Sequence, residues 1–250
     1  KGQYGMDVDW IGHNVSVENM RRVTASIKRE FMMKFRRMVA EIEASNVTSL
    51  KTLRTFAGSA NHVANLIKAW RPFLDELWAA IAALLSGKAS NAPRNCIWRS
   101  QIQHTLDWIH AFLQLEGQAV ERSWSLESFM QPATTVSFTF DASPFGLGGF
   151  VSVNGIITEY FADVLSPFDT SFFNASIGDA AGQQTWEALA LLVGLRAWSH
   201  LWKDHRCALM VEGDNVGALT LIAKFKAAGR GPGVIAREVA LLFSEASFEP

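Results

Sequence analysis

The stretch VSFTFDASPFGLGGFVSVNGIITEYF, residues Val136 to Phe161, decides the fold class of this chain. Its first five residues alternate apolar and polar side chains, which is typical of a half-buried strand. Asp141 follows that run, and a glycine-rich bend separates it from a second strand. The second strand runs into Asn154-Gly155, a strong hairpin signal, so a third strand is expected after it. The stretch therefore predicts a three-stranded meander with a carboxylate at the end of its first strand.

The composition is that of a folded chain with a large apolar core. Of the 250 residues, 49% are hydrophobic and 19% are charged, which suits one large domain or two modest ones. No run of about 18 apolar residues occurs, so we expect no membrane span. The first ten residues lack an apolar signal segment, and the two cysteines match no metal spacing, which favours a reducing compartment. We therefore expect an intracellular protein, cytoplasmic or nuclear and not secreted.

The net charge of -1 hides an asymmetry between the two halves. Residues 1–130 hold 16 Lys and Arg against 12 Asp and Glu, whereas residues 131–250 hold 7 against 12. A basic half beside an acidic half fits a polyanion-binding surface joined to a carboxylate metal site. Because neither imbalance is large, chance remains an alternative explanation.

A basic helix is predicted from Glu18 to about Ser45. Apolar residues recur there every three or four positions, which is the pattern of an amphipathic helix, and basic residues lie between them. Arg29, Arg36 and Arg37 belong to this basic set. They form either a solvated face or a set of contacts to the phosphates of a duplex.

A second helix is predicted after Ser49, which can cap it. Its polar side carries Lys51, Arg54, Gly58 and Asn61. A glycine within a helix costs about 1 kcal/mol relative to alanine, so it usually has a packing or close-approach reason. We expect that this side of the helix presses against another helix or against a nucleic-acid groove.

Three acids stand out in the second half of the chain. Asp141 ends the first strand, Glu187 lies early in a long predicted helix, and Asp214 follows a short apolar run. Each acid has an ordinary alternative role: Asp141 could close an Asx turn, Glu187 could pair with an arginine, and Asp214 could cap a helix. An unpaired carboxylate on an apolar helix face costs several kcal/mol, so Glu187 should have a partner, which a metal ion could be.

In this order of elements and acids, the chain resembles the RNase H fold. The matching motifs are TFDASPFGLGGF, QQTWEALALLVGL and MVEGDNVGALTLI. Upstream, VDWIGHNVSVE is similar to the last strand of a reverse transcriptase palm, SLKTLRTFAGSANHVANLIKAWRPFLDELW to the thumb, and CIWRSQIQHTLDWIHAFL to the connecting helix. The nearest resemblance is to the reverse transcriptases of DIRS-like and gypsy-like retrotransposons.

This resemblance implies an α/β protein in which a helical thumb-like segment precedes an RNase H-like mixed five-stranded domain, truncated at its C-terminus. The implied parts are the end of a palm-like strand region, a thumb and connection, a connector and an incomplete RNase H-like domain, at residues 1–17, 18–115, 116–134 and 135–250. The polymerase motif Tyr-x-Asp-Asp is absent, as expected if the fingers and most of the palm lie upstream of Lys1. The fourth acid of the family is expected beyond Pro250.

The resemblance also implies an activity: hydrolysis of the RNA strand of RNA–DNA hybrids by a ribonuclease H attached to a retrotransposon reverse transcriptase. Two Mg²⁺ or Mn²⁺ ions would be held by Asp141, Glu187 and Asp214, which would be the catalytic residues as well as the metal ligands. Hybrid or duplex, and the rest of the polyprotein, would be the partners. The implied nucleic-acid contacts are Arg29, Arg36, Arg37, Lys51, Arg54, Gly58, Asn61 and Asn215. Two alternatives stay open: a non-catalytic nucleic-acid-binding remnant of a retroelement polyprotein, and a structural scaffold.

Overall fold

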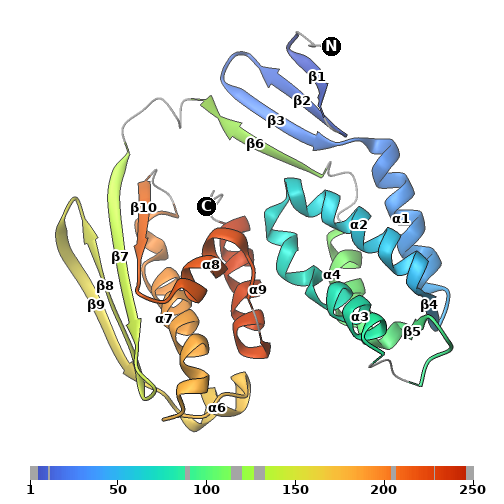
Figure 1. Ribbon diagram of the computed structural model, residues 1–250. Coiled ribbons are helices and arrows are strands. Elements are labelled where there is room, and N and C mark those ends of the chain that lie inside the picture. Colours follow the sequence, from blue (N-terminus) through green and yellow to red (C-terminus); the bar gives the residue numbers. More distant parts are fainter. Residues whose placement is uncertain are drawn as a thin grey trace. The chain divides into compact units, whose positions relative to one another are not determined.

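The computed structural model describes residues 5–10, 12–87, 91–113, 120–126, 133–203, 207–227 and 229–245. The chain forms two compact units, Lys1–Met130 and Gln131–Pro250, each with its own sheet and helices (Figure 1). Within the described ranges, no helix is both long enough and apolar enough to span a membrane.

The first unit contains an antiparallel sheet with the strand order β1-β2-β3-β6. The segment VDWIGHNVSVE, compared above with a single palm strand, contributes to two strands, because β1 (Asp7–Trp10) pairs with β2 (His13–Glu18). β6 (Glu121–Ser125) pairs with β3 (Arg22–Ile27), so part of the predicted connector is a strand of this sheet.

The helix predicted from Glu18 is wrong in its first ten residues. These residues complete the β2–β3 hairpin, and Asn19 and Met20 form its turn with φ values of 48° and 55°. The Arg21 N–H closes the turn by donating to the Glu18 carbonyl at 2.9 Å. Apolar positions spaced by four residues also lie on one face of a strand, so the sequence pattern fits both structures. Helix α1 begins only at Arg29.

Helices and short strands make up the rest of the first unit. Ser49 caps α2 as predicted, since its side chain accepts from the Thr52 N–H at 3.1 Å. The last predicted helix of the unit begins at Gln103 and not at Cys96, because the residues before it form a short strand and a 3-10 turn. The elements are α1 (Arg29–Glu43), β4 (Val47–Ser49), α2 (Leu50–Leu66), η1 (Lys68–Leu74), α3 (Asp75–Leu85), β5 (Cys96–Trp98), η2 (Arg99–Ile102) and α4 (Gln103–Leu113).

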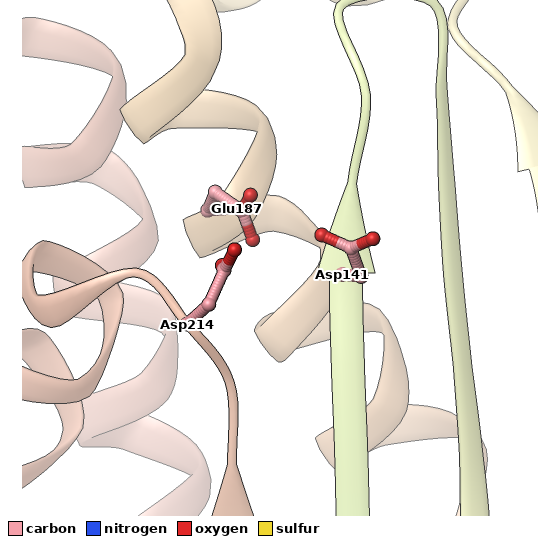
Figure 2. Close-up of side chains that lie close together, drawn as sticks. All are labelled: Asp141, Glu187 and Asp214. Carbon is pink, nitrogen blue, oxygen red and sulfur yellow. The ribbon is translucent and has the colours of Figure 1, made fainter.

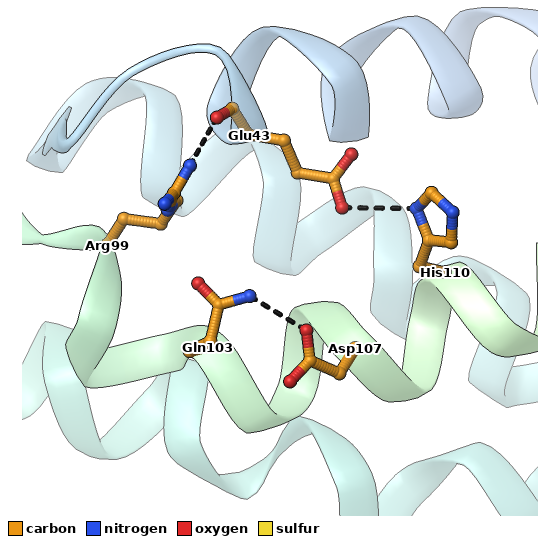
Figure 3. Close-up of polar contacts among 5 residues, drawn as sticks. All are labelled: Glu43, Arg99, Gln103, Asp107 and His110. Atoms are coloured by element: carbon orange, nitrogen blue, oxygen red, sulfur yellow. Dashed lines mark hydrogen bonds and ion pairs between the residues drawn. The ribbon is translucent and has the colours of Figure 1, made fainter.

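Polar contacts tie the C-terminal end of α1 to η2 and α4 (Figure 3). The Arg99 guanidinium donates to the main-chain carbonyl of Glu43, and His110 Nδ1 lies 3.1 Å from Glu43 Oε1. Because the last carbonyls of a helix have no partner within it, Arg99 satisfies one of the acceptors that α1 leaves open. Within α4, the Gln103 amide donates to Asp107 Oδ1 at 2.7 Å. The apolar core of this unit includes Phe35, Leu53, Phe56, Leu77 and Leu106.

The second unit contains a mixed sheet with the order β10-β7-β8-β9. β7 (Thr134–Ala142), β8 (Gly146–Val153) and β9 (Ile156–Val164) form the predicted antiparallel meander, and β10 (Cys207–Glu212) is parallel to β7. Asn154 and Gly155 make the predicted tight turn, with φ values of 50° and 83°. The mixed α/β fold class is confirmed. The fifth strand of the expected sheet was predicted to begin at Phe248, which lies outside the described residues.

Helices cover one face of this sheet. α7 (Gln183–Ala197) packs on β7 and β8, and α8 (Val216–Lys224) and α9 (Arg230–Glu245) pack on α7 (Figure 1). The short helix α6 (Pro167–Phe173) packs against α9. This arrangement places the end of β7, the first half of α7 and the end of β10 near one another.

Candidate metal centre

Asp141 lies near the C-terminal end of β7. Phe138 and Phe140 point into the core and are almost fully buried, whereas Asp141 is exposed. Its Oδ1 accepts a hydrogen bond from the Ala142 N–H at 2.9 Å. This bond is to the next residue and not to the one two positions on, so it does not form the Asx turn considered above. It leaves the second oxygen of the carboxylate available.

Glu187 is buried within α7. Only 3% of its surface is exposed, although its side chain carries a carboxylate. α7 can approach β7 closely because Gly194, two turns after Glu187, lies against the Phe138 ring. A side chain at that position would overlap the ring, so the glycine brings the helix of Glu187 onto the strand of Asp141.

Asp214 follows β10 at a second close approach. A Cβ at Gly213 would lie 2.6 Å from Phe140 Cζ, so only glycine lets the chain after β10 pass this ring. Asn215, and not Asp214, is the N-cap of α8, because its Oδ1 accepts from the Ala218 N–H at 3.0 Å. The helix start is therefore satisfied without Asp214, and the Asp214 carboxylate is directed toward the other two acids.

The three acids predicted from the sequence converge. One oxygen from each of Asp141, Glu187 and Asp214 lies within 4.8 Å of the others, and the carboxylates face one another from β7, α7 and the end of β10 (Figure 2). Two unit negative charges at this distance repel by roughly 3 kcal/mol at an effective dielectric constant of about 20. A cation between them would turn this repulsion into attraction.

The donor set fits a hard divalent cation. Mg²⁺ prefers carboxylate oxygens and keeps several water ligands, so two or three carboxylates from an exposed edge suit it. Glu187 Oε2 is buried and has no hydrogen-bond partner among the described residues. Because a buried charged oxygen without a partner is costly, this atom is well suited to coordinate a cation.

The pKa of Glu187 reflects the same environment. Burial raises the pKa of this carboxyl above its ordinary value, and the charges of Asp141 and Asp214 raise it further. A hydrogen bond from Gln183 opposes these two effects. A bound cation would also oppose them, because it stabilises the ionised form.

The sequence-based reasoning did not single out Gln183. Its Nε2 donates to Glu187 Oε1 at 2.9 Å and also to the main-chain oxygen of Ala142. The available signal was a glutamine four residues before a buried glutamate, which places both side chains on one helix face.

The three candidate arginines of α1 differ in their surroundings. Arg29, Arg36 and Arg37 are all exposed. The Arg36 guanidinium nevertheless donates to the main-chain oxygen of Leu113 at 2.5 Å, so it links α1 to the end of α4. Arg29 and Arg37 therefore remain the better candidates for contact with phosphates.

The polar residues predicted on α2 form one exposed stripe. Lys51, Arg54, Gly58 and Asn61 are all exposed and lie three or four residues apart. A Cβ at Gly58 would meet no atom within 4 Å. Packing against another helix of the described residues therefore does not explain this glycine. The exposed backbone of α2 at Gly58 is accessible to an external partner.

Asn215, the last predicted nucleic-acid contact, is partly exposed and caps α8. Its oxygen is used by the cap, so its amide nitrogen is the group that an external partner could still contact.

Comparisons with known proteins give weak similarities. No family profile and no curated protein matches the sequence. Among solved structures, the foamy viral protease–reverse transcriptase dRH with double-stranded DNA is 14% identical, with a TM-score of 0.30, and the match covers 94% of this chain and 36% of that one. The same viral enzyme with an RNA/DNA hybrid is 14% identical, with a TM-score of 0.30 and coverages of 85% and 30%. This chain thus spans about a third of those proteins, and similarities this low carry no argument about fold or function.

Proposed function

We propose that this chain is the RNase H region, with part of the thumb and connection, of a retrotransposon reverse transcriptase of the DIRS-like or gypsy-like kind. Its activity would be hydrolysis of the RNA strand of RNA–DNA hybrids. The observation that carries this proposal is the convergence of three carboxylates within 4.8 Å at the end of a mixed sheet. From the retroelement resemblance we also propose that the rest of the polyprotein is a partner of this chain and that the chain acts inside the cell.

The proposed activity would use two divalent ions, Mg²⁺ or Mn²⁺, and the group formed by Asp141, Glu187 and Asp214 would supply carboxylate ligands to them. When bound, such ions activate a water molecule and stabilise the leaving oxygen in phosphoryl displacement. Asp141 would bridge the two sites, and Glu187 and Asp214 would each favour one. The rigid β7, α7 and β10 hold these carboxylates in place before substrate arrives, which lowers the reorganisation that the reaction requires.

Room for a nucleic-acid backbone exists beside Asp141. An open pocket of about 500 Å³ lies there, and its lining combines Ser143, Gly146, Gly148 and Ala162 with the larger Leu147, Asp163 and Val164. Bare backbone at the glycines would let a ribose and phosphate approach closely, and contact with the 2′-hydroxyl would distinguish RNA from DNA. On the first unit, Arg29, Arg37 and the exposed stripe of α2 would hold the duplex through its phosphates.

Metal titration combined with a cleavage assay tests this proposal. Calorimetry should show Mn²⁺ binding to the wild type, and a labelled RNA–DNA hybrid should be cleaved only when the metal is present. D141N and D214N should lose at least 100-fold in cleavage, since each removes a charged ligand. The matched control is E212Q, which changes an exposed acid of β10 that accepts from Thr139 Oγ1 at 3.3 Å and should cleave normally.

The outcomes separate the alternatives. Hybrid binding without metal binding or cleavage would favour the non-catalytic remnant. Absence of metal binding and of hybrid binding would leave only the scaffold. Equal Mn²⁺ affinity in the wild type and D141N would remove the metal assignment itself.

A further inference from the structure

Gln183 connects two of the three elements that carry the acids. It is the first residue of α7, one turn before Glu187, and its side chain is partly buried. Its Nε2 donates to Glu187 Oε1 at 2.9 Å and to the main-chain oxygen of Ala142, the residue after Asp141. A single amide group therefore joins the buried glutamate to the end of β7.

The orientation of this amide follows from its partners. A main-chain carbonyl and a carboxylate can only accept hydrogen bonds, so the NH₂ group and not the oxygen must face both. Both hydrogens of Nε2 are then used. Gln183 Oε1 is buried and has no partner among the described residues, so the side chain gives up one favourable interaction to keep this position.

The consequence concerns the two oxygens of Glu187. Oε1 is held by Gln183, whereas Oε2 is buried and has no partner among the residues that the structure describes. A glutamate side chain has several rotatable bonds, and fixing them costs conformational free energy. A hydrogen bond that fixes them before the ion arrives removes this cost from binding.

We propose that Gln183 is a positioning residue that holds the Glu187 carboxylate in place and thereby raises the affinity of the triad for a divalent cation. This inference rests on the proposed metal site but fails separately from it. Replacing residues that hydrogen bond to metal ligands typically lowers metal affinity or activity by 10–100-fold. The same range is expected here.

The test compares two neighbouring glutamines in the absence of nucleic acid. Q183M keeps the length and approximate volume of the side chain but removes both donors. Q184M is the control, since Gln184 lies next along the same helix, is exposed, and makes no hydrogen bond to the triad within the described residues. Calorimetric Mn²⁺ titration should show a dissociation constant about 10–100-fold larger for Q183M than for the wild type. Q184M should remain within about twofold of the wild type.

Measuring binding without nucleic acid excludes direct contact of Gln183 with substrate as the cause of the loss. Urea unfolding of the metal-free proteins shows whether the native state persists in Q183M. A readout on the wild type keeps the proposal testable even if Q183M does not fold. The side-chain NH₂ protons of Gln183 should exchange with solvent at least tenfold more slowly than those of an exposed glutamine, in metal-free protein.

Two results would overturn the proposal: unchanged Mn²⁺ affinity in folded Q183M, or rapid exchange of the Gln183 NH₂ protons. A third result would overturn the metal site and, with it, this inference. If the wild type and D141N bind Mn²⁺ equally, the metal site is wrong, and slow NH₂ exchange would then support only the hydrogen bond that holds Glu187.

Discussion

Gly194 of α7 lies against the Phe138 ring of β7 so closely that a methyl group at that glycine would overlap the ring. The contact sets how near α7 comes to the sheet, and α7 carries Glu187. The spacing of the acids thus depends on a residue that has no functional group.

The first prediction is that G194A weakens both folding and metal binding. Overpacking in a well-filled core typically costs about 1–3 kcal/mol, and shifting α7 would move Glu187 away from Asp141. Urea unfolding should show this loss, and the Mn²⁺ dissociation constant should rise. G233A is the control, because a Cβ at Gly233 of α9 would meet no atom within 4 Å. Equal stability of both variants would show that the Gly194 contact does not limit packing.

The second prediction concerns the pH dependence of the metal-free protein. The pKa of Glu187 is raised in the folded state, first by burial and then by Asp141 and Asp214. Between the ordinary pKa and the raised one, the folded state holds more protons than the unfolded state, so the free energy of unfolding falls as pH rises through this interval. Above the raised pKa the loss is complete, and below the ordinary pKa it is absent.

E187Q should remove this pH-dependent loss. At pH 7 the metal-free variant should be more stable than the wild type by roughly 1–3 kcal/mol, because a buried charge is replaced by a neutral amide. It should also lose Mn²⁺ binding. Denaturant unfolding from pH 4 to 8 with EDTA present measures the effect. A wild type whose stability rises over this range relative to E187Q would contradict the assigned direction.

The third prediction separates two adjacent residues at the end of β10. D214N should abolish tight metal binding yet leave the helix start intact, because Asn215 makes the cap of α8. N215A should cost about 1 kcal/mol of stability, the usual loss of an N-cap. Mn²⁺ titration and thermal unfolding of both variants would test this division. A large loss of stability in D214N, without a loss in N215A, would show that Asp214 and not Asn215 caps α8.

The fourth prediction divides the arginines of α1. R29A/R37A should reduce the slope of log affinity against log salt for hybrid binding by about one unit per lost phosphate contact. R36A should instead lower the unfolding free energy, because Arg36 bonds to the Leu113 carbonyl. Fluorescence anisotropy over a range of salt concentrations, with unfolding curves for each variant, distinguishes the two effects. An unchanged slope in R29A/R37A would show that Arg29 and Arg37 belong to a solvated face and do not contact phosphates.

Most of the second unit could be predicted because its signals are local. Alternation gives β7, Asn154-Gly155 gives the hairpin, and the positions of Asp141, Glu187 and Asp214 on their elements predict convergence at one edge of the sheet. The role of Gln183 depends on a main-chain oxygen across the fold, which no periodicity reports.

The errors in the first unit have a different cause. β3 is a strand because β2 and β6 flank it, and β6 is almost one hundred residues away in sequence, as the Thr24–Ser123 hydrogen bond shows. The turn before β3 uses Met20 with a positive φ, and methionine gives no signal for such a turn. Tertiary pairing therefore overrides a helical apolar spacing.

The wide separation of Asp141, Glu187 and Asp214 along the chain has a kinetic consequence. Their carboxylates meet only when β7, α7 and β10 are assembled, so the unfolded chain offers no comparable cluster. An ion that binds only the native state stabilises it by mass action. If the acids converge after the rate-limiting step of folding, the ion will slow unfolding and leave the folding rate unchanged. In a chevron plot, saturating Mn²⁺ would then lower the unfolding arm alone. The two arms would therefore show whether the three carboxylates converge before or after the transition state of folding.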